Sequence, residues 1–224
     1  MQTKISSITA RVLLASACMV TVMTALSGCL PLAATGALIG ATVSVDRRTV
    51  GTQIDDQTIQ LRANQRIKEV LPGDDKGYAY VTSHNRRVLL TGLAPDARSK
   101  ARAEQIAASV DNVRGVYNEL NIGSPSLLSS SARDTLVTAK VRSALFQDKT
   151  IEATAVRVVT ELRTVYLMGL VTREEGTHIS KVASQIPGVD KVLTIFDFIS
   201  EQDLKTLQRE REQAAEKQPA PVNN

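Results

Sequence analysis

The spacing of apolar residues changes several times between residues 132 and 200, and each change predicts a helix or a strand. Segment 135–148 repeats apolar residues every three or four positions, which predicts an amphipathic helix. Segments 155–161 and 164–171 are rich in β-branched residues that alternate with others, as is typical of strands. Segment 173–186 returns to the helical spacing, and segment 189–199 predicts a final strand. The predicted order is therefore helix, strand, strand, helix, strand.

The ends of these elements carry residues with strong positional preferences. Asp134 or Thr135 can cap the first helix, because a short side chain with an oxygen accepts a bond from the free N–H groups there. Only Leu162 and Arg163 separate the two alternating strands, which predicts a two-residue hairpin. A Pro-Gly pair at 187–188 ends the second helix.

The same pattern occurs a second time in the chain. Segment 86–122 aligns with segment 163–199, and the helix-like segment 58–71 precedes the first copy as 135–148 precedes the second. Val88, Leu90, Gly92 and Leu93 match Val165, Leu167, Gly169 and Leu170 at an offset of 77, whereas Ile106, Ala107, Val113 and Val116 match Val182, Ala183, Val189 and Val192 at an offset of 76. The chain therefore contains two copies of one module.

This repeat sets the expected domain boundaries. We expect a first module at 46–123, a Ser-rich linker at 124–131 and a second module at 132–200. Residues 201–224 are expected to form a charged helical extension that fades into a disordered end containing proline. A strand-helix-strand connection allows the last strand of each module to lie parallel to a hairpin strand. The predicted fold class is α+β, with a small mixed three-stranded sheet packed by two helices in each module.

Composition restricts what these modules can contain. Apolar residues make up 43% of the 224 residues, but aromatic residues make up only 3% and Trp is absent, so the cores must be aliphatic. The formal net charge of +4 at pH 7 is too small for a nucleic-acid-binding protein, which concentrates basic residues on one face. Both cysteines, Cys18 and Cys29, precede the modules, which excludes a disulfide framework or a cysteine-based zinc site from them.

The N-terminus has the pattern of a secretory signal. Residues 1–11 contain two basic residues and no acid, and a 15-residue apolar stretch follows at 12–26. That stretch is short for a membrane-spanning helix, which needs about 20 apolar residues. The tetrapeptide Leu26-Ser27-Gly28-Cys29 resembles the bacterial lipobox, in which small residues admit the signal peptidase and a thiol accepts a diacylglyceryl group. We therefore expect residues 1–28 to be removed and Cys29 to begin the mature protein.

An uncleaved helix over residues 12–45 is the alternative, but Gly28 and Pro31 interrupt it. With a third acyl chain on the freed amine of Cys29, anchoring would be stable, and residues 29–45 would form a lipidated tether. By resemblance to the sorting rules of Gram-negative bacteria, Leu30 after the cysteine favours the outer membrane. Apart from these covalent acyl chains, we expect no cofactor.

Two motifs and the duplication carry a family resemblance. The strand V-x-L-x-G-L, the helix-to-strand segment A-x-x-I/V-A-x-x-x-x-G-V-x-x-V and the two copies resemble the BON domain, a module of bacterial surface and osmotic-stress proteins. The resemblance covers nearly all of residues 54–200, and with the lipobox the whole chain is similar to outer-membrane lipoproteins with two BON domains. It implies phospholipid binding and a role in outer-membrane integrity.

No catalytic constellation is visible. His84 lies in a polar turn and His178 on the expected solvent side of a helix, and we expect both at the surface. The adjacent acid pairs at 55–56 and 74–75 suit caps and turns better than acid–base catalysis. The sequence has no Gly-rich phosphate loop, nucleophile elbow or HExxH motif. We therefore predict that the protein is not an enzyme and holds no metal.

The first helix of the second module contains the candidate phospholipid-binding residues. Cations beside exposed apolar side chains can lie at an anionic membrane surface, where each contributes about 1 kcal/mol. Asp134 and Asp148 would offset part of this attraction. Alternatively, the apolar residues of the set pack on the second module's sheet or on the first module. The candidates are Arg133, Leu136, Lys140, Arg142, Phe146 and Lys149.

Two functions remain open at this point. The first is an outer-membrane-anchored periplasmic lipoprotein whose second module binds anionic membrane phospholipids. The second is a protein-interaction adaptor that docks on envelope assembly or division machinery. Vesicle binding separates the two, and neither involves nucleic acid.

Overall fold

Two copies of one α-β-β-α-β module make up most of the described structure. The structure is a computed structural model that describes residues 46–73, 77–123 and 131–216. Residues 43–224 form one compact unit of the chain. The predicted α+β fold class with two mixed three-stranded sheets is confirmed.

Several sequence predictions fall outside the described residues. They concern Cys29, the signal at 1–28, the tether at 29–45 and most of the linker at 124–131. The predicted charged extension forms helix α6 (Glu201–Glu216), and the residues after it also lie outside the described part.

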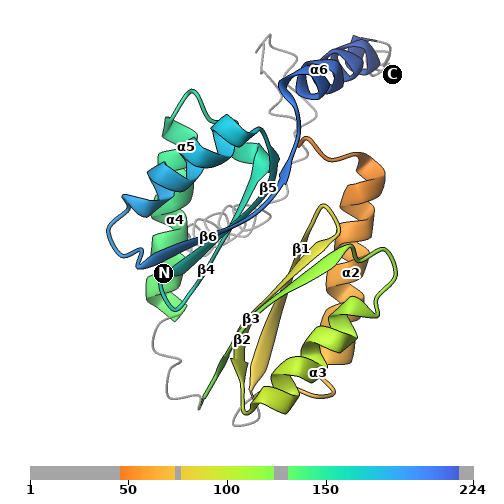
Figure 1. The fold of residues 1–224 in the computed structure, drawn as a ribbon, viewed down its shortest axis with the longest axis vertical. Helices are drawn as coiled ribbons and strands as arrows, with labels where there is room; N and C mark the ends of the chain where they lie inside the picture. Colours follow the sequence, from red (N-terminus) through yellow and green to blue (C-terminus); the bar gives the residue numbers. More distant parts are fainter. Residues whose placement is uncertain (1–45, 74–76, 124–130, 217–224) are drawn as a thin grey trace, which may run out of the picture. The chain divides into compact units, whose positions relative to one another are not determined.

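The first module contains one hairpin, one crossover helix and one preceding helix (Figure 1). Strand β1 pairs antiparallel with β2, and β2 pairs parallel with β3, so the sheet order is β1-β2-β3. Figure 1 shows α2 and α3 on the same face of this sheet. The elements are α2 (Val50–Ile67), β1 (Tyr78–His84), β2 (Arg87–Ala94), α3 (Ala97–Ala108) and β3 (Gly115–Ile122).

The second module repeats this arrangement. Strand β4 pairs antiparallel with β5, and β5 pairs parallel with β6, which leaves β4 at one edge of the sheet. Helix α5 begins with a capping box in which Thr172 and Glu175 satisfy each other's backbone N–H groups. The elements are α4 (Ser131–Gln147), a short 3-10 helix at Ala153–Ala155, β4 (Val156–Glu161), β5 (Thr164–Val171), α5 (Arg173–Ser184) and β6 (Lys191–Phe198).

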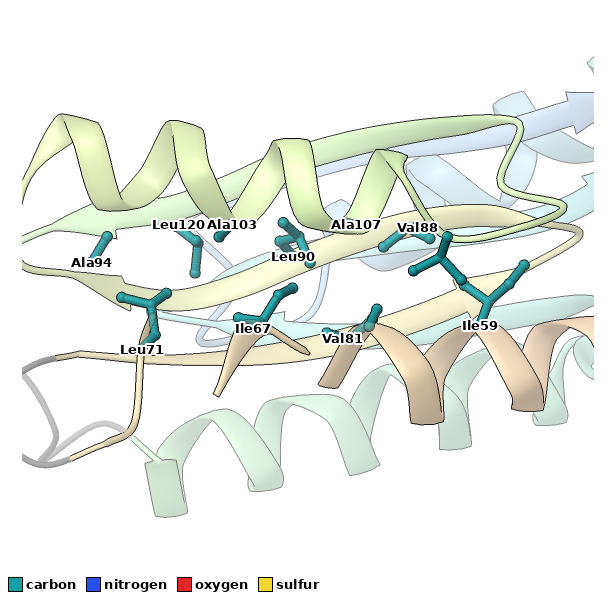
Figure 2. Close-up of a cluster of buried hydrophobic side chains, with 12 residues drawn as sticks. Ile59, Ile67, Leu71, Val81, Val88, Leu90, Ala94, Ala103, Ala107 and Leu120 are labelled. Atoms are coloured by element: carbon teal, nitrogen blue, oxygen red, sulfur yellow. The ribbon is translucent and has the colours of Figure 1, made fainter. Parts of the chain in front are cut away.

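Each module has its own aliphatic core between its helices and its sheet. Figure 2 shows the first core, where Ile59 and Ile67 of α2 meet Val88 and Leu90 of β2. Ala103 and Ala107 of α3 complete this layer. The second core is built in the same way, from Val137, Val141, Leu145, Ile151, Val158, Val165, Leu167, Val171, Ile179 and Ala183. Burying each large side chain contributes about 1.5–3 kcal/mol, so neither core needs aromatic residues.

Both hairpins turn through two residues, as the sequence predicts. Asn85 and Arg86 have φ values of 52° and 64°, and Leu162 and Arg163 have φ values of 47° and 61°. Positive φ at both central positions matches the type I′ turn, which fits the twist of a hairpin. A non-glycine residue with this conformation costs about 1–2 kcal/mol, so other contacts must hold each turn.

A buried aspartate from the first helix of each module supplies that contact. Asp56 accepts hydrogen bonds from the backbone nitrogens of both residues of the first turn, at 2.8 and 2.7 Å. Asp134 does the same for the second turn, at 2.9 Å for each nitrogen. The prediction that Asp134 caps α4 is therefore wrong, because α4 begins three residues earlier, at Ser131. The first helix of the first module also begins earlier than predicted, at Val50, where Thr49 caps it.

The faces of the two sheets that the helices leave uncovered share a third apolar cluster. Leu89 of β2 packs there with Tyr166 and Met168 of β5 and Ile195 of β6. Charged residues at its margin also connect the modules, since Arg87 pairs with Asp197 at 2.7 Å. Because β2 and β5 are buried on both faces, they are almost continuously apolar rather than alternating.

The prediction that His84 lies at the surface is wrong. Its side chain is buried at the end of β1, next to the segment that precedes α2. Burial, followed by the positive charge of Arg48, lowers the pKa of His84 to about 4. The imidazole is therefore neutral at pH 7. His178 is partly exposed on α5, and its Nε2 lies 2.8 Å from a carboxylate oxygen of Asp148.

Candidate functional site

Helix α4 covers the sheet of the second module with one face and presents the opposite face to solvent. Val137, Val141 and Leu145 recur at every fourth residue and are buried in the second core. Asp134 lies on the same buried face, where it holds the hairpin turn. Its carboxylate therefore faces the turn and lies on the buried side of the helix.

The exposed face of α4 carries a row of four apolar residues and one serine that we call the α4 crest. Its residues are separated by four, three, four and three positions, so they lie along one side of the helix. The side chain of Leu136 is 56% exposed and that of Phe146 is 80% exposed, which contradicts the alternative that they pack inside the protein. The crest consists of Ala132, Leu136, Ala139, Ser143 and Phe146.

Cations lie on both sides of the α4 crest. Arg133 and Lys140, seven residues apart, lie together on one side, whereas Arg142 lies on the other. Lys149 follows the end of the helix, so the structure divides the predicted set rather than gathering it into one cluster. Within the part of the chain that the structure describes, none of these four cations forms an ion pair.

The remaining nearby acid is already engaged. Hydrogen bonds from Thr150, followed by one with His178, lower the pKa of Asp148 to about 2. Its carboxylate therefore stays charged but faces these partners. The α4 crest and its flanks are consequently apolar and positive, a combination suited to contact with an anionic amphiphile.

An open cavity of about 730 Å³ adjoins the second side of α4. Arg142 and Phe146 line it together with Arg157 of β4, and Arg48 and His84 contribute from the first module. The guanidinium of Arg142 donates a 3.2 Å hydrogen bond to the carbonyl oxygen of Val158 on the edge strand.

Arg157, Arg48 and His84 also belong to this region, although the sequence gives no signal that connects them with α4. Arg157 occupies one position of an alternating strand, where an exposed polar residue is expected and attracts no attention. Arg48 and His84 are distant from α4 in sequence, and no spacing rule connects them with it. Only the facing positions of the two modules bring these side chains to one cavity.

Across the described ranges, no helix combines the length and the apolar character needed to cross a membrane. The same residues also contain no group of three His, Cys, Asp or Glu side chains placed to hold a metal ion.

Comparison with known proteins gives a family and relatives. The BON domain family model matches residues 55–124 and 133–194. The outer membrane lipoprotein DolP of Haemophilus influenzae is 34% identical over 174 residues, which cover 78% of this chain and 90% of that protein. The 21 kDa hemolysin of Actinobacillus pleuropneumoniae is 28% identical over 155 residues, covering 69% of this chain and 80% of that protein. The C-terminal domain of CdsD, a structural protein of the type III secretion system of Chlamydia trachomatis, is 11% identical and covers 61% of this chain and 96% of that one, but its TM-score of 0.26 supports no inference.

Proposed function

This chain belongs to the BON domain family, and from that premise we propose that it is an outer-membrane lipoprotein that binds anionic phospholipid through helix α4. Acyl chains on Cys29 hold it at the membrane from the periplasmic side, and its contact with lipid supports outer-membrane integrity. The outer-membrane location is supported by the name of the Haemophilus relative and by the lipobox-like sequence that ends at Cys29. The BON domain is not known as an enzyme family, which agrees with the absence of catalytic motifs from the sequence.

The exposed α4 crest is the observation that carries the proposal. Leu136 and Phe146 expose large apolar side chains on one helix face, where they gain from leaving water. Full burial of either side chain contributes about 1.5–3 kcal/mol, and each nearby cation adds about 1 kcal/mol at an anionic surface. The two terms are comparable, so binding should respond both to salt and to loss of an apolar side chain.

Anchoring and lipid contact then have separate roles. Two or more acyl chains are enough for stable attachment, so α4 does not need to hold the protein at the membrane. Contact of the α4 crest with headgroups would instead select a lipid composition or orient the second module.

Flotation with vesicles tests the proposal. The fragment of residues 44–224 contains both cores and omits the predicted acyl anchor, so any vesicle binding comes from the folded part. We expect it to float with vesicles of phosphatidylglycerol or cardiolipin in phosphatidylcholine at low salt, and not with phosphatidylcholine alone. If it floats with neither at low salt, the proposal is wrong and the adaptor hypothesis is favoured.

Matched substitutions locate the contact. Lys140→Glu should weaken binding about 30-fold, because charge reversal removes about 2 kcal/mol. Lys181→Glu on α5 is the control with the same change in net charge at another exposed lysine. Leu136→Ser should weaken binding about tenfold, and Leu61→Ser, at a leucine that is 60% exposed on α2, should not. Equal effects within either pair would place the contact elsewhere.

A further inference from the structure

The cavity beside α4 lies at the free edge of strand β4. Its wall is formed by α4, by the segment 153–158 and by residues that precede α2 or end β1. The cavity is open to solvent and borders the α4 crest, because Phe146 belongs to both. A molecule held there would therefore lie next to the proposed membrane-facing surface.

Two of the cavity's three arginines provide positive charge without a counter-ion. Arg48 is paired with Asp46 and with Asp56, whose nearest oxygens lie 2.5 and 2.6 Å from its guanidinium. Within the described ranges, neither Arg142 nor Arg157 pairs with a carboxylate. Burial lowers the pKa of Arg157, and the positive charges of Arg142 and Arg48 lower it further, which outweighs the opposing effect of the Asp56 carboxylate. An anion bound in the cavity near both arginines would relieve this repulsion.

The other groups in the cavity favour a ligand that is anionic at one end and apolar at the other. His84 is neutral at pH 7 and neither adds to nor offsets the positive charge. Apolar side chains line the cavity on the α4 and β4 sides and include Leu145, Phe146, Val156 and Val158. Guanidinium groups match the oxygens of phosphate with paired N–H donors.

We propose that Arg142 and Arg157 bind the phosphodiester of an anionic lipid headgroup in this cavity, with the adjoining glycerol and acyl carbons against Phe146. This inference rests on the proposed membrane contact of α4 and assigns the headgroup a specific site. Free phosphate shares the recognised group but lacks the apolar part, which separates the two sources experimentally.

NMR titration of the 44–224 fragment tests the site directly. Dihexanoyl phosphatidylglycerol, kept below its micelle concentration, should shift the backbone amide signals of residues 153–158 in a saturable way. Inorganic phosphate should shift the same signals with at least tenfold weaker affinity, because it gains nothing from the apolar wall. Arg157→Gln should weaken binding of the short-chain lipid about tenfold, whereas Arg102→Gln, at an exposed arginine on α3, should leave it unchanged.

The outcomes distinguish this inference from the proposed function. If Arg157→Gln binds the short-chain lipid as tightly as wild type, the headgroup site is wrong, even if Leu136→Ser still weakens vesicle flotation. If inorganic phosphate binds as tightly as the lipid, the cavity is a phosphate site and the lipid assignment is wrong. If wild type shows neither saturable shifts nor flotation with anionic vesicles, both proposals fail. Far-UV circular dichroism of each variant checks that it is folded.

Discussion

Replacing Asp56 with alanine should remove several interactions at once. Its side chain is only 2% exposed and accepts a 2.6 Å hydrogen bond from Ser83 Oγ, in addition to those from the backbone nitrogens of Asn85 and Arg86. The guanidinium of Arg48 pairs with it at 2.6 Å. The substitution would therefore leave two turn N–H groups without their acceptor, in residues whose positive φ is already unfavourable.

The expected loss follows from these contacts. Each unsatisfied buried donor costs about 1–3 kcal/mol, and breaking a buried ion pair costs about 3–5 kcal/mol. Arg48 keeps its second partner, Asp46, and water can reach part of the turn, so we expect a total of about 3–5 kcal/mol. The equivalent Asp134→Ala should cost less, about 2 kcal/mol, because Asp134 accepts from two backbone nitrogens and, among the described residues, pairs with no guanidinium.

Urea unfolding of the 44–224 fragment, followed by far-UV circular dichroism, measures these differences. Asp111→Ala is the control, because this carboxylate is 79% exposed and its pair with Arg62 contributes no more than about 0.5 kcal/mol. Asp56→Asn should fall between wild type and Asp56→Ala, since an amide oxygen can still accept one turn hydrogen bond. If Asp56→Ala and Asp111→Ala unfold at the same urea concentration, Asp56 does not hold the turn and this reasoning is refuted.

Three further predictions concern the anchor, a close backbone contact and pH. Cys29→Ser should abolish incorporation of labelled palmitate in a Gram-negative host and release the protein from the membrane fraction; retention of the label would contradict the lipobox assignment. Gly169→Ala should lower the free energy of unfolding by about 1–3 kcal/mol, because the added Cβ would lie 2.5 Å from the backbone carbonyl oxygen of Ala155. The control is Gly51→Ala on α2, where the added Cβ meets no such contact and should not be destabilising in the same urea assay. Burial raises the pKa of Asp197, but hydrogen bonds from Arg87 and an asparagine outweigh it and hold the pKa below 3.8. The Arg87–Asp197 pair is therefore stabilising above pH 3.8, and its contribution is lost as pH falls through the lower folded-state pKa of Asp197. Urea unfolding from pH 7 to pH 2.5 should show that the difference in stability between wild type and Asp197→Asn shrinks below pH 3.8. A constant difference would contradict this prediction.

The order of elements and both hairpins could be predicted because they depend on local pattern. Alternation and helical spacing differ clearly in this chain, and two residues between alternating strands leave little choice of turn. The duplication supports these predictions, because both copies predict the same order of helices and strands. The outward position of Leu136 and Phe146 does not follow from the sequence, since spacing shows which residues share a helix face but not whether another module covers that face.

The contacts that the sequence did not reveal join residues far apart in the chain. Asp134 has the residue type and position of a helix cap, yet it bonds a turn 28 and 29 residues away. His84 has the sequence surroundings of a surface turn, yet it is buried and lines one cavity with residues that precede α2. The cavity with Arg142 and Arg157 requires a helix, an edge strand and the other module together, and no single-segment pattern describes such a place.

The two copies share the parts that hold a module together and differ on the outward face of the first helix. Lys68, the residue directly after α2, occupies the place that Phe146 occupies in α4, counted from the turn-holding aspartate of each copy. Helix α2 exposes the aliphatic side chains of Ile54 and Leu61 and contains no aromatic residue, whereas α4 adds Phe146, whose side chain is 80% exposed. The large exposed side chain of Phe146 gains free energy from leaving water at a lipid surface, and a lysine in its place does not. The core and the turn are shared by both modules, and the outward face of the first helix is free to differ between them. We infer that the membrane contact belongs to the second module.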